Sequence, residues 1–267
     1  VLAVPAVAPG TMRKNERLAH YVADADAVAV LVDAWAARQL QLRPGASPVG
    51  APIVELGGLE AAYGGDSARV DPHAPAYLQY TSGSTRAPRG VVISHDQLAA
   101  QLTMLARCVA LAPGEAVVNP MPLYHDFGLI MSLHALTSGG RLVLLPAQYA
   151  IRDPGLWLTS LDAYNAVLTA SAPFLLDLCT RRVDEAHRDA LDLSSLRKLL
   201  VGAEPIPASC LRAFMERFAA CGFAPKAMRP GYGLAEATLI LSLSDDSGPV
   251  IRGFDARSLR AGWAAPD

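Results

Sequence analysis

Four short segments of this 267-residue sequence place hydroxyl, charged or aromatic side chains beside glycine or proline, where they could contact a ligand. The first follows Tyr80 and reads Thr81-Ser-Gly-Ser-Thr-Arg-Ala-Pro-Arg89-Gly. Small hydroxyl residues and glycines let backbone N–H groups approach phosphate oxygens, and Arg89 can pair with a phosphate through two hydrogen bonds. The segment lacks the Gly-Lys-Ser/Thr ending of a Walker loop. Taken alone, it could equally be an ordinary Ser/Gly turn.

The second segment is Met121-Pro-Leu-Tyr-His125-Asp126-Phe-Gly-Leu-Ile130. An aspartate just before a helical pattern is typical of a helix cap, so Asp126 could be structural and His125 could simply pack. Both residues could also face a ligand, because helix N-termini at the edge of a parallel sheet are common ligand sites. The residues alone leave both interpretations open.

The third and fourth segments are Gly202-Ala-Glu-Pro205 and Gly231-Tyr-Gly-Leu-Ala-Glu-Ala-Thr238. Tyr232, flanked by glycines, could stack on a flat base, and the Glu236 carboxylate could hold a hard cation. Singly, Tyr232 could be a packed turn aromatic and Glu236 a solvated helix residue.

The elements that must position these segments are short apolar runs alternating with stretches of helical period. Strands are predicted at 27–32, 76–81, 116–119, 141–145, 166–169 and 196–201, and helices at 13–23, 95–111, 127–137, 155–164, 173–181 and 208–221. Continuous apolar strands separated by helices predict an α/β fold with parallel sheets flanked by helices. Ser94 and Gln97 predict a capping box for the helix at 95.

Composition excludes several classes of protein. Apolar residues make up 52%, charged residues 18%, the net charge is −2 and the mean hydropathy is +0.25. This balance argues against disorder and against a basic nucleic-acid surface, and the sequence has no run of 18 apolar residues for a membrane helix. The four cysteines lack metal-ligand spacing, so we expect reduced thiols and a cytoplasmic protein.

Two stretches interrupt the alternation of strands and helices. The Gly- and Pro-rich segment 43–51 predicts a loop between sub-regions. Residues 243–267 lose the alternation and predict one turn of helix around 256–259.

The four segments, in this order, resemble the motifs of the adenylate-forming superfamily, which includes acyl-CoA synthetases and peptide-synthetase adenylation domains. Within it, the chain is similar to the fatty acyl-AMP ligases at 124–130, at 232–238 and at 253–262. The last of these stretches, Gly-Phe-Asp-Ala-Arg-Ser-Leu-Arg-Ala-Gly, resembles an insertion characteristic of those ligases. The resemblance covers about Val4 to Gly262.

The resemblance implies an enzyme that uses ATP and Mg²⁺ to convert a fatty acid into acyl-adenylate and pyrophosphate. The acyl group would pass to an acyl carrier protein of lipid, polyketide or non-ribosomal peptide biosynthesis. The implied catalytic residues are His125, Glu236 and Arg89, with Glu236 also holding Mg²⁺. The implied nucleotide-binding residues are Thr81, Ser82, Gly83, Ser84, Thr85, Gly202, Ala203, Glu204, Tyr232, Gly233 and Ala235.

The resemblance also implies a longer enzyme. We expect residues 1–242 to be part of an N-terminal adenylation domain and 243–267 to be the insertion. A ribose-binding Asp and a lid domain with a catalytic Lys are expected outside these residues, so the fragment should be weakly active or inactive alone. The alternatives are an acyl-CoA synthetase, with 243–267 as a plain linker, and a non-catalytic acyl-adenylate-binding module.

Overall fold

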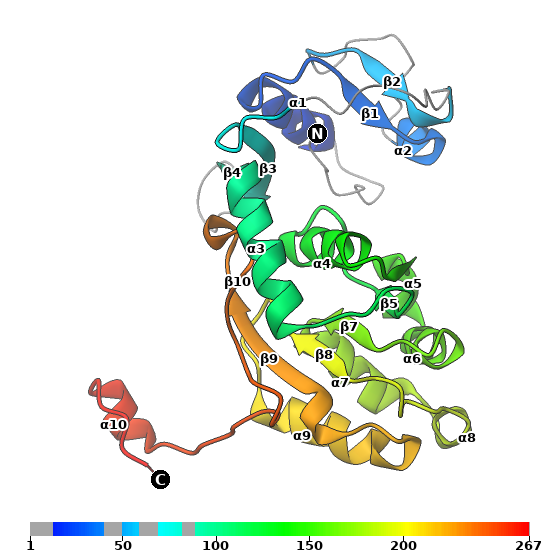
Figure 1. The fold of residues 1–267 in the computed structure, drawn as a ribbon, viewed down its shortest axis with the longest axis vertical. Helices are drawn as coiled ribbons and strands as arrows, with labels where there is room; N and C mark the ends of the chain where they lie inside the picture. The colour runs from blue at the N-terminus through cyan, green and yellow to red at the C-terminus, as the bar shows by residue number, and fades with distance from the viewer. Residues whose placement is uncertain (1–12, 40–49, 59–68, 82–88, 267) are drawn as a thin grey trace. The chain divides into compact units, whose positions relative to one another are not determined.

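The computed structural model describes residues 13–39, 50–58, 69–81 and 89–266, and the chain divides into two compact units, Val1–Leu98 and Ala99–Asp267 (Figure 1). The elements of the first unit are α1 (Arg13–Asp24), β1 (Val30–Val32), α2 (Ala34–Gln39), β2 (Ile53–Glu55), the 3-10 turn η1 (Leu56–Gly58), β3 (Pro75–Thr81) and β4 (Arg89–Ser94). Helix α3 (His95–Cys108) begins in this unit and continues into the second.

The first unit contains a small parallel sheet and a separate hairpin. β1 pairs with β2, and Leu18, Val22, Val32 and Ile53 form the core beneath them. The strand predicted at 27–32 is only three residues long. The first residues of the predicted strand belong instead to the turn that ends α1. Asp26 has a φ of +46°, and the Ala27 N–H donates to the Val22 carbonyl at 3.0 Å.

β3 and β4 form an antiparallel hairpin in which Thr81 pairs with Arg89. β3 was predicted at 76–81, whereas β4 was not among the predicted strands. The β-branched run Val91-Val-Ile93 explains why this stretch extends as a strand. The predicted capping box is confirmed in part, since the Ser94 N–H donates to Gln97 Oε1 at 2.9 Å.

The second unit is an α/β domain (Figure 1). Its strands are β5 (Ala116–Asn119), β6 (Arg141–Leu144), β7 (Leu168–Ser171), β8 (Lys198–Val201), β9 (Met228–Gly233) and β10 (Ile240–Leu243). Its helices are α4 (Asp126–Thr137), α5 (Ala147–Arg152), α6 (Pro154–Ala163), α7 (Pro173–Arg182), α8 (Glu185–Asp189), α9 (Ala208–Phe218) and α10 (Ala256–Arg260), with 3-10 turns η2 (Ala219–Cys221), η3 (Pro225–Ala227) and η4 (Ala235–Ala237).

The strand order is β10-β9-β8-β7-β5-β6. All neighbouring pairs are parallel except β10 with β9, so the predicted parallel sheet is in fact mixed. β9 was missed because Pro230, Gly231 and Gly233 interrupt it, and such residues are depleted from strands. The turn predicted around 256–259 is confirmed as α10.

Helices cover both faces of this sheet. On one face α6, α7 and α9 enclose a core built around Trp157, Phe214 and Phe218, into which Leu199 and Val201 of β8 point. Leu200, between them, is also buried and faces the other side, where α4 packs against β5, β6 and β7. In Figure 1, α4 lies on one side of the strands and α6, α7 and α9 on the other.

The chain reverses direction across the sheet at β5. It first steps outward from β5 through α4 to β6, then returns through α5 and α6 to β7 on the other side of β5 and continues to β8 and β9. Ligands of open α/β sheets bind outside the carboxyl ends of the strands at such a reversal. The β5–β7 boundary therefore indicates where to look for a site.

Among the described residues, no helix is long and apolar enough to cross a membrane. Cys108, Cys179, Cys210 and Cys221 are free cysteines.

Candidate functional site

Three of the four predicted segments lie at one edge of the second unit's sheet. The parallel strands β5, β7, β8 and β9 end at this carboxyl edge, and the segments containing His125, Gly202 and Tyr232 follow or end β5, β8 and β9. An added Cβ on Gly202 would lie 3.2 Å from the Gly231 carbonyl oxygen and 3.9 Å from Cε1 of Phe127, which shows how close the three segments come.

His125 is the N-cap of α4, and Asp126 is the first residue of that helix. One of the two interpretations left open made Asp126 the cap; the structure gives that role to His125. His125 Nδ1 accepts the Phe127 N–H at 3.3 Å and lies 2.6 Å from Asp126 Oδ1, which accepts the same N–H at 2.7 Å. The His125 side chain is 43% exposed, while that of Asp126 is 11% exposed. The pair therefore orients an accessible imidazole at the carboxyl edge.

Asn119 anchors the segment before His125. It was not among the predicted site residues. It is the last residue of β5 and is buried. Its Nδ2 donates to the Gly128 carbonyl and to Ser132 Oγ, both at 2.8 Å, and its Oδ1 accepts the Met121 N–H at 3.0 Å. The sequence did contain a signal for this role, because Asn119 is the one polar residue at the end of the apolar run 116–118.

Gly128 completes this anchor. A Cβ on Gly128 would come within 2.1 Å of the Pro122 carbonyl oxygen, so only glycine allows α4 to start so close to the segment before it.

The segment after β8 contains a strained residue. Gly202 is buried, whereas Ala203 and Glu204 are exposed. Ala203 has a φ of +72°, a left-handed conformation that costs an L-residue about 1 kcal/mol. The Glu204 carboxylate accepts the Phe174 N–H at the start of α7, at 2.8 Å.

The segment at the end of β9 presents an aromatic ring and a carboxylate. Tyr232 is 65% exposed, and Glu236, in η4, is also exposed. A Cβ on Gly233 would lie 1.8 Å from the Leu239 carbonyl oxygen, so glycine is required there, and Ala235 is buried beneath the turn.

Gln101 of α3, which was also not predicted, contacts the strand that follows this turn. It is 6% exposed and its Oε1 accepts the Ile240 N–H at 3.1 Å, while its Nε2 has no hydrogen-bond partner. Gln101 and Ile240 are 139 positions apart in the sequence, so no local pattern could predict this contact.

The remaining predicted residues belong to the first unit. Thr81 ends β3 and pairs with Arg89, which begins β4, so the two flank residues 82–88; Arg89 is exposed. Ser82, Gly83, Ser84 and Thr85 lie outside the described residues.

Tyr80, beside Thr81, donates its hydroxyl to Asp24 at 2.5 Å, and burial together with this carboxylate raises the pKa of Tyr80.

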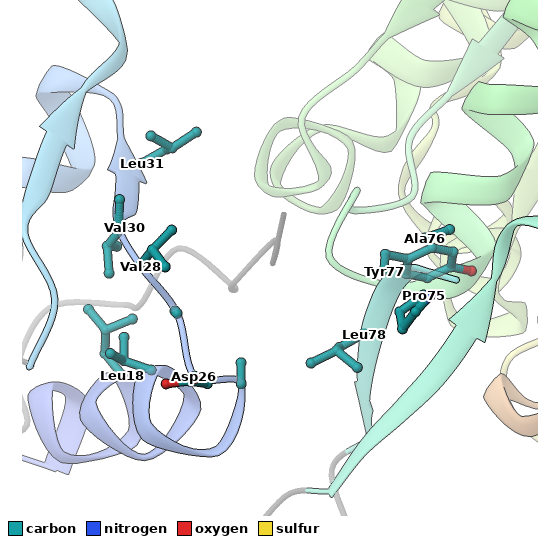
Figure 2. Close-up of a pocket in the computed structure, with 13 residues that line it drawn as sticks. Leu18, Asp26, Val28, Val30, Leu31, Pro75, Ala76, Tyr77 and Leu78 are labelled. Carbon is teal, nitrogen blue, oxygen red and sulfur yellow. The ribbon is translucent and has the colours of Figure 1, made fainter. Parts of the chain in front are cut away.

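The first unit also contains an apolar pocket of about 450 Å³, lined by α1, the segment after it and β3 (Figure 2). Figure 2 shows Leu18 and Val30 on one side and Pro75 and Leu78 on the other. None of the predicted site residues lines it. In the described part of the chain, no group of three or more His, Cys, Asp or Glu side chains could hold a metal ion.

Comparison with known proteins gives a consistent result. The family model described as "AMP-binding enzyme" matches residues 5–267. The FadD28 long-chain-fatty-acid–AMP ligase of Mycobacterium tuberculosis is 32% identical over 277 residues, covering 99% of this chain and 48% of its own. A Mycobacterium tuberculosis protein described as a fatty-acid–CoA ligase, FadD21, is 35% identical, covering 98% of this chain and 47% of its own.

Solved structures agree. A structure from a study of fatty acyl-adenylate ligases of E. coli and L. pneumophila is 31% identical with a TM-score of 0.83, over 97% of this chain and 46% of that one. The L. pneumophila ligase in complex with acyl adenylate and pyrophosphate is 27% identical with a TM-score of 0.82, over 96% of this chain and 45% of that one. The chain spans about half the length of the relatives it matches. By the match over residues 5–267, the chain belongs to the AMP-binding enzyme family.

Proposed function

We propose that this chain is the nucleotide- and acyl-binding part of a longer enzyme that activates a fatty acid with ATP, forming acyl-adenylate and releasing pyrophosphate. The observation that carries the proposal is the convergence of His125, Gly202 and Tyr232 at the carboxyl edge beside the β5–β7 reversal. The names of the FadD28 and L. pneumophila relatives support the choice of fatty acid and adenylate.

In the proposed reaction a carboxylate oxygen of the fatty acid attacks the α-phosphorus of ATP. The bond from that phosphorus to the bridging oxygen breaks, and pyrophosphate leaves with the electron pair. Both reactants are anionic, so the site must stabilise negative charge on phosphoryl oxygens. Because Nδ1 of His125 faces Asp126 and the Phe127 N–H, Nε2 is the ring nitrogen left to donate to such an oxygen.

Adenine binding is assigned to the segments after β8 and at the end of β9. The exposed ring of Tyr232 offers a stacking surface, and the backbone of Gly202 and Ala203 would line the opposite side of the base. Gly233 and Ala235 shape the turn that carries Tyr232.

Mg²⁺ is proposed at Glu236. Proteins usually bind this ion through one or two carboxylates together with substrate phosphates, so one exposed carboxylate fits it. When bound, the ion would shield the phosphate charge.

The segment Thr81–Arg89 of the first unit is proposed to hold the pyrophosphate end, as the family resemblance implies. Arg89 is exposed, and its guanidinium can pair with a phosphate through two hydrogen bonds. Ser82, Gly83, Ser84 and Thr85 would add hydroxyl and backbone donors.

The second step is proposed to be transfer to the phosphopantetheine thiol of an acyl carrier protein, with residues 243–267 as the ligase-type insertion. Residues 1–242 are proposed as part of the adenylation domain. The alternative is transfer to coenzyme A, which the name of the FadD21 relative favours.

The test uses the full-length protein with ATP, Mg²⁺ and a series of fatty acids, and follows products by mass. We expect acyl-adenylate that persists with coenzyme A and is consumed by a pantetheinylated carrier protein. Rapid formation of acyl-CoA would replace the ligase proposal with a synthetase. No adenylate from any acid would refute the activation step itself.

A further inference from the structure

Helix α7 begins at the carboxyl edge without a cap of its own. Its N-cap residue, Ala172, has no side chain that could accept a hydrogen bond, and its first residue is Pro173. The first turn of a helix has unpaired N–H donors that normally need an acceptor. Here the acceptor comes from thirty residues further along the chain, because Glu204 Oε1 lies 2.8 Å from the Phe174 N–H.

The same contact fixes the segment after β8. The Gly202 N–H donates to the Ser171 carbonyl at 3.2 Å, and Glu204 is bound to α7, so Ala203 is held between two anchors. Ala203 has a φ of +72°, a conformation that persists only when the surroundings impose it. Removing one anchor should therefore release Ala203.

A neighbouring thiol makes a second contact at this junction. Cys210 of α9 donates its thiol to the Pro173 carbonyl at 3.3 Å. Burial, aided by the charges of Asp177 and Glu204, raises the pKa of Cys210, so the thiol remains a donor. The segment after β8 and the start of α9 are thus both attached to the first turn of α7.

We infer that Glu204 is a positioning residue. Its carboxylate caps α7 and thereby holds the backbone of Gly202 and Ala203 in the conformation that receives the nucleotide, without itself contacting the nucleotide or a metal ion. This inference rests on the proposed function and refines the role that the resemblance implied for Glu204.

The test compares Glu204→Gln, which keeps the acceptor oxygen but removes the charge, with Glu204→Ala, which removes both. Glu216→Ala is the matched control, because Glu216 is an exposed carboxylate of α9. All variants are made in the full-length protein. Hydrogen exchange of the first turn of α7 is measured without substrates, and the KM for ATP and kcat of adenylate formation are measured separately.

We expect Glu204→Ala to speed exchange at Phe174 about 10-fold and to raise the KM for ATP about 10-fold, with kcat changed less than 3-fold. Glu204→Gln and Glu216→Ala should stay within about 3-fold of wild type in all three measurements. Unchanged exchange in Glu204→Ala would overturn the cap. Equal loss of ATP affinity in the Gln and Ala variants would overturn positioning in favour of a direct charge contact. If the wild-type protein makes no adenylate, the proposed function fails, while the exchange data still decide the cap.

Discussion

The two edges of the six-stranded sheet use charge in opposite ways. At the amino edge, Asp246 pairs with Lys198 at 3.1 Å and with the almost fully buried Arg229, and Glu115 pairs with Arg197 at 2.6 Å. At the carboxyl edge, Glu236 is exposed and forms no ion pair with any described residue.

This contrast separates charges that hold the fold from charges that remain available to a ligand. The amino-edge carboxylates accept hydrogen bonds that lower their pKa: Asp246 chiefly from Lys198, and Glu115 chiefly from the Ala112 N–H, with burial opposing in both cases. A carboxylate already paired with a cation of the protein is less available to a metal ion than an unpaired one. The edge with the fewer internal pairs is therefore the better candidate for chemistry.

The sharpest test of the contrast is Glu236→Gln. We expect adenylate formation to fall about 100-fold, because the variant loses the charge proposed to hold Mg²⁺ at the phosphates. The urea midpoint should not change, since the side chain is exposed. Pyrophosphate release by the full-length protein measures the first effect, with Glu216→Gln as the control. A wild-type rate in Glu236→Gln would break the contrast.

The opposite result is expected from Asp246→Ala. Arg229 is 4% exposed and would lose its carboxylate partner, so we expect a loss of about 1–2 kcal/mol in unfolding free energy, moderated because Asp246 itself is 80% exposed. The KM for ATP should be unchanged. Urea unfolding measures the loss, and adding Arg229→Met to Asp246→Ala should recover part of it. A double variant no more stable than Asp246→Ala would show that the pair does not account for the loss.

Acid should weaken the fold through His134, which is fully buried in α4 and whose Nε2 lies 2.9 Å from the Val109 carbonyl. Burial lowers the pKa of His134, partly offset by that hydrogen bond. The unfolded chain therefore binds the proton more readily, and stability present above about pH 6.5 is lost as the pH falls toward 5, on the order of 1 kcal/mol. Thermal unfolding across this range measures the loss, and His134→Gln should flatten it. An equal slope in the variant would assign the effect to other groups.

The sequence predicted the elements whose signal is local. Ala116–Asn119 forms β5 with the predicted bounds, because its first three residues are a continuous apolar run, as in a strand buried on both faces. β9 contains Pro230 and two glycines, so its strand character depends on its neighbours β8 and β10. Local propensity could not reveal it.

The same distinction holds at the site. The His125–Asp126 pair was predictable as a pair because its members are adjacent in sequence. Asn119, Gln101 and the partner of Glu204 act through contacts across 9 to 139 residues, which only the folded chain brings together. The sequence therefore offers candidates for ligand contact, which stay predictions, but it does not reveal which residues hold those candidates in place.

The antiparallel direction of β10 separates the tail after β10 from the carboxyl edge of the sheet. Because β10 runs against β9, the chain leaves the sheet at the amino edge, where Asp246 fastens it to Arg229. Tyr232 lies three positions after Arg229 along β9, or about 10 Å of strand. Residues 254–266 then close on themselves through a bridge between Phe254 and Pro266. Insertions, deletions or exchanges in this tail would therefore act at the amino edge of the sheet, away from the carboxyl edge where the nucleotide site is proposed.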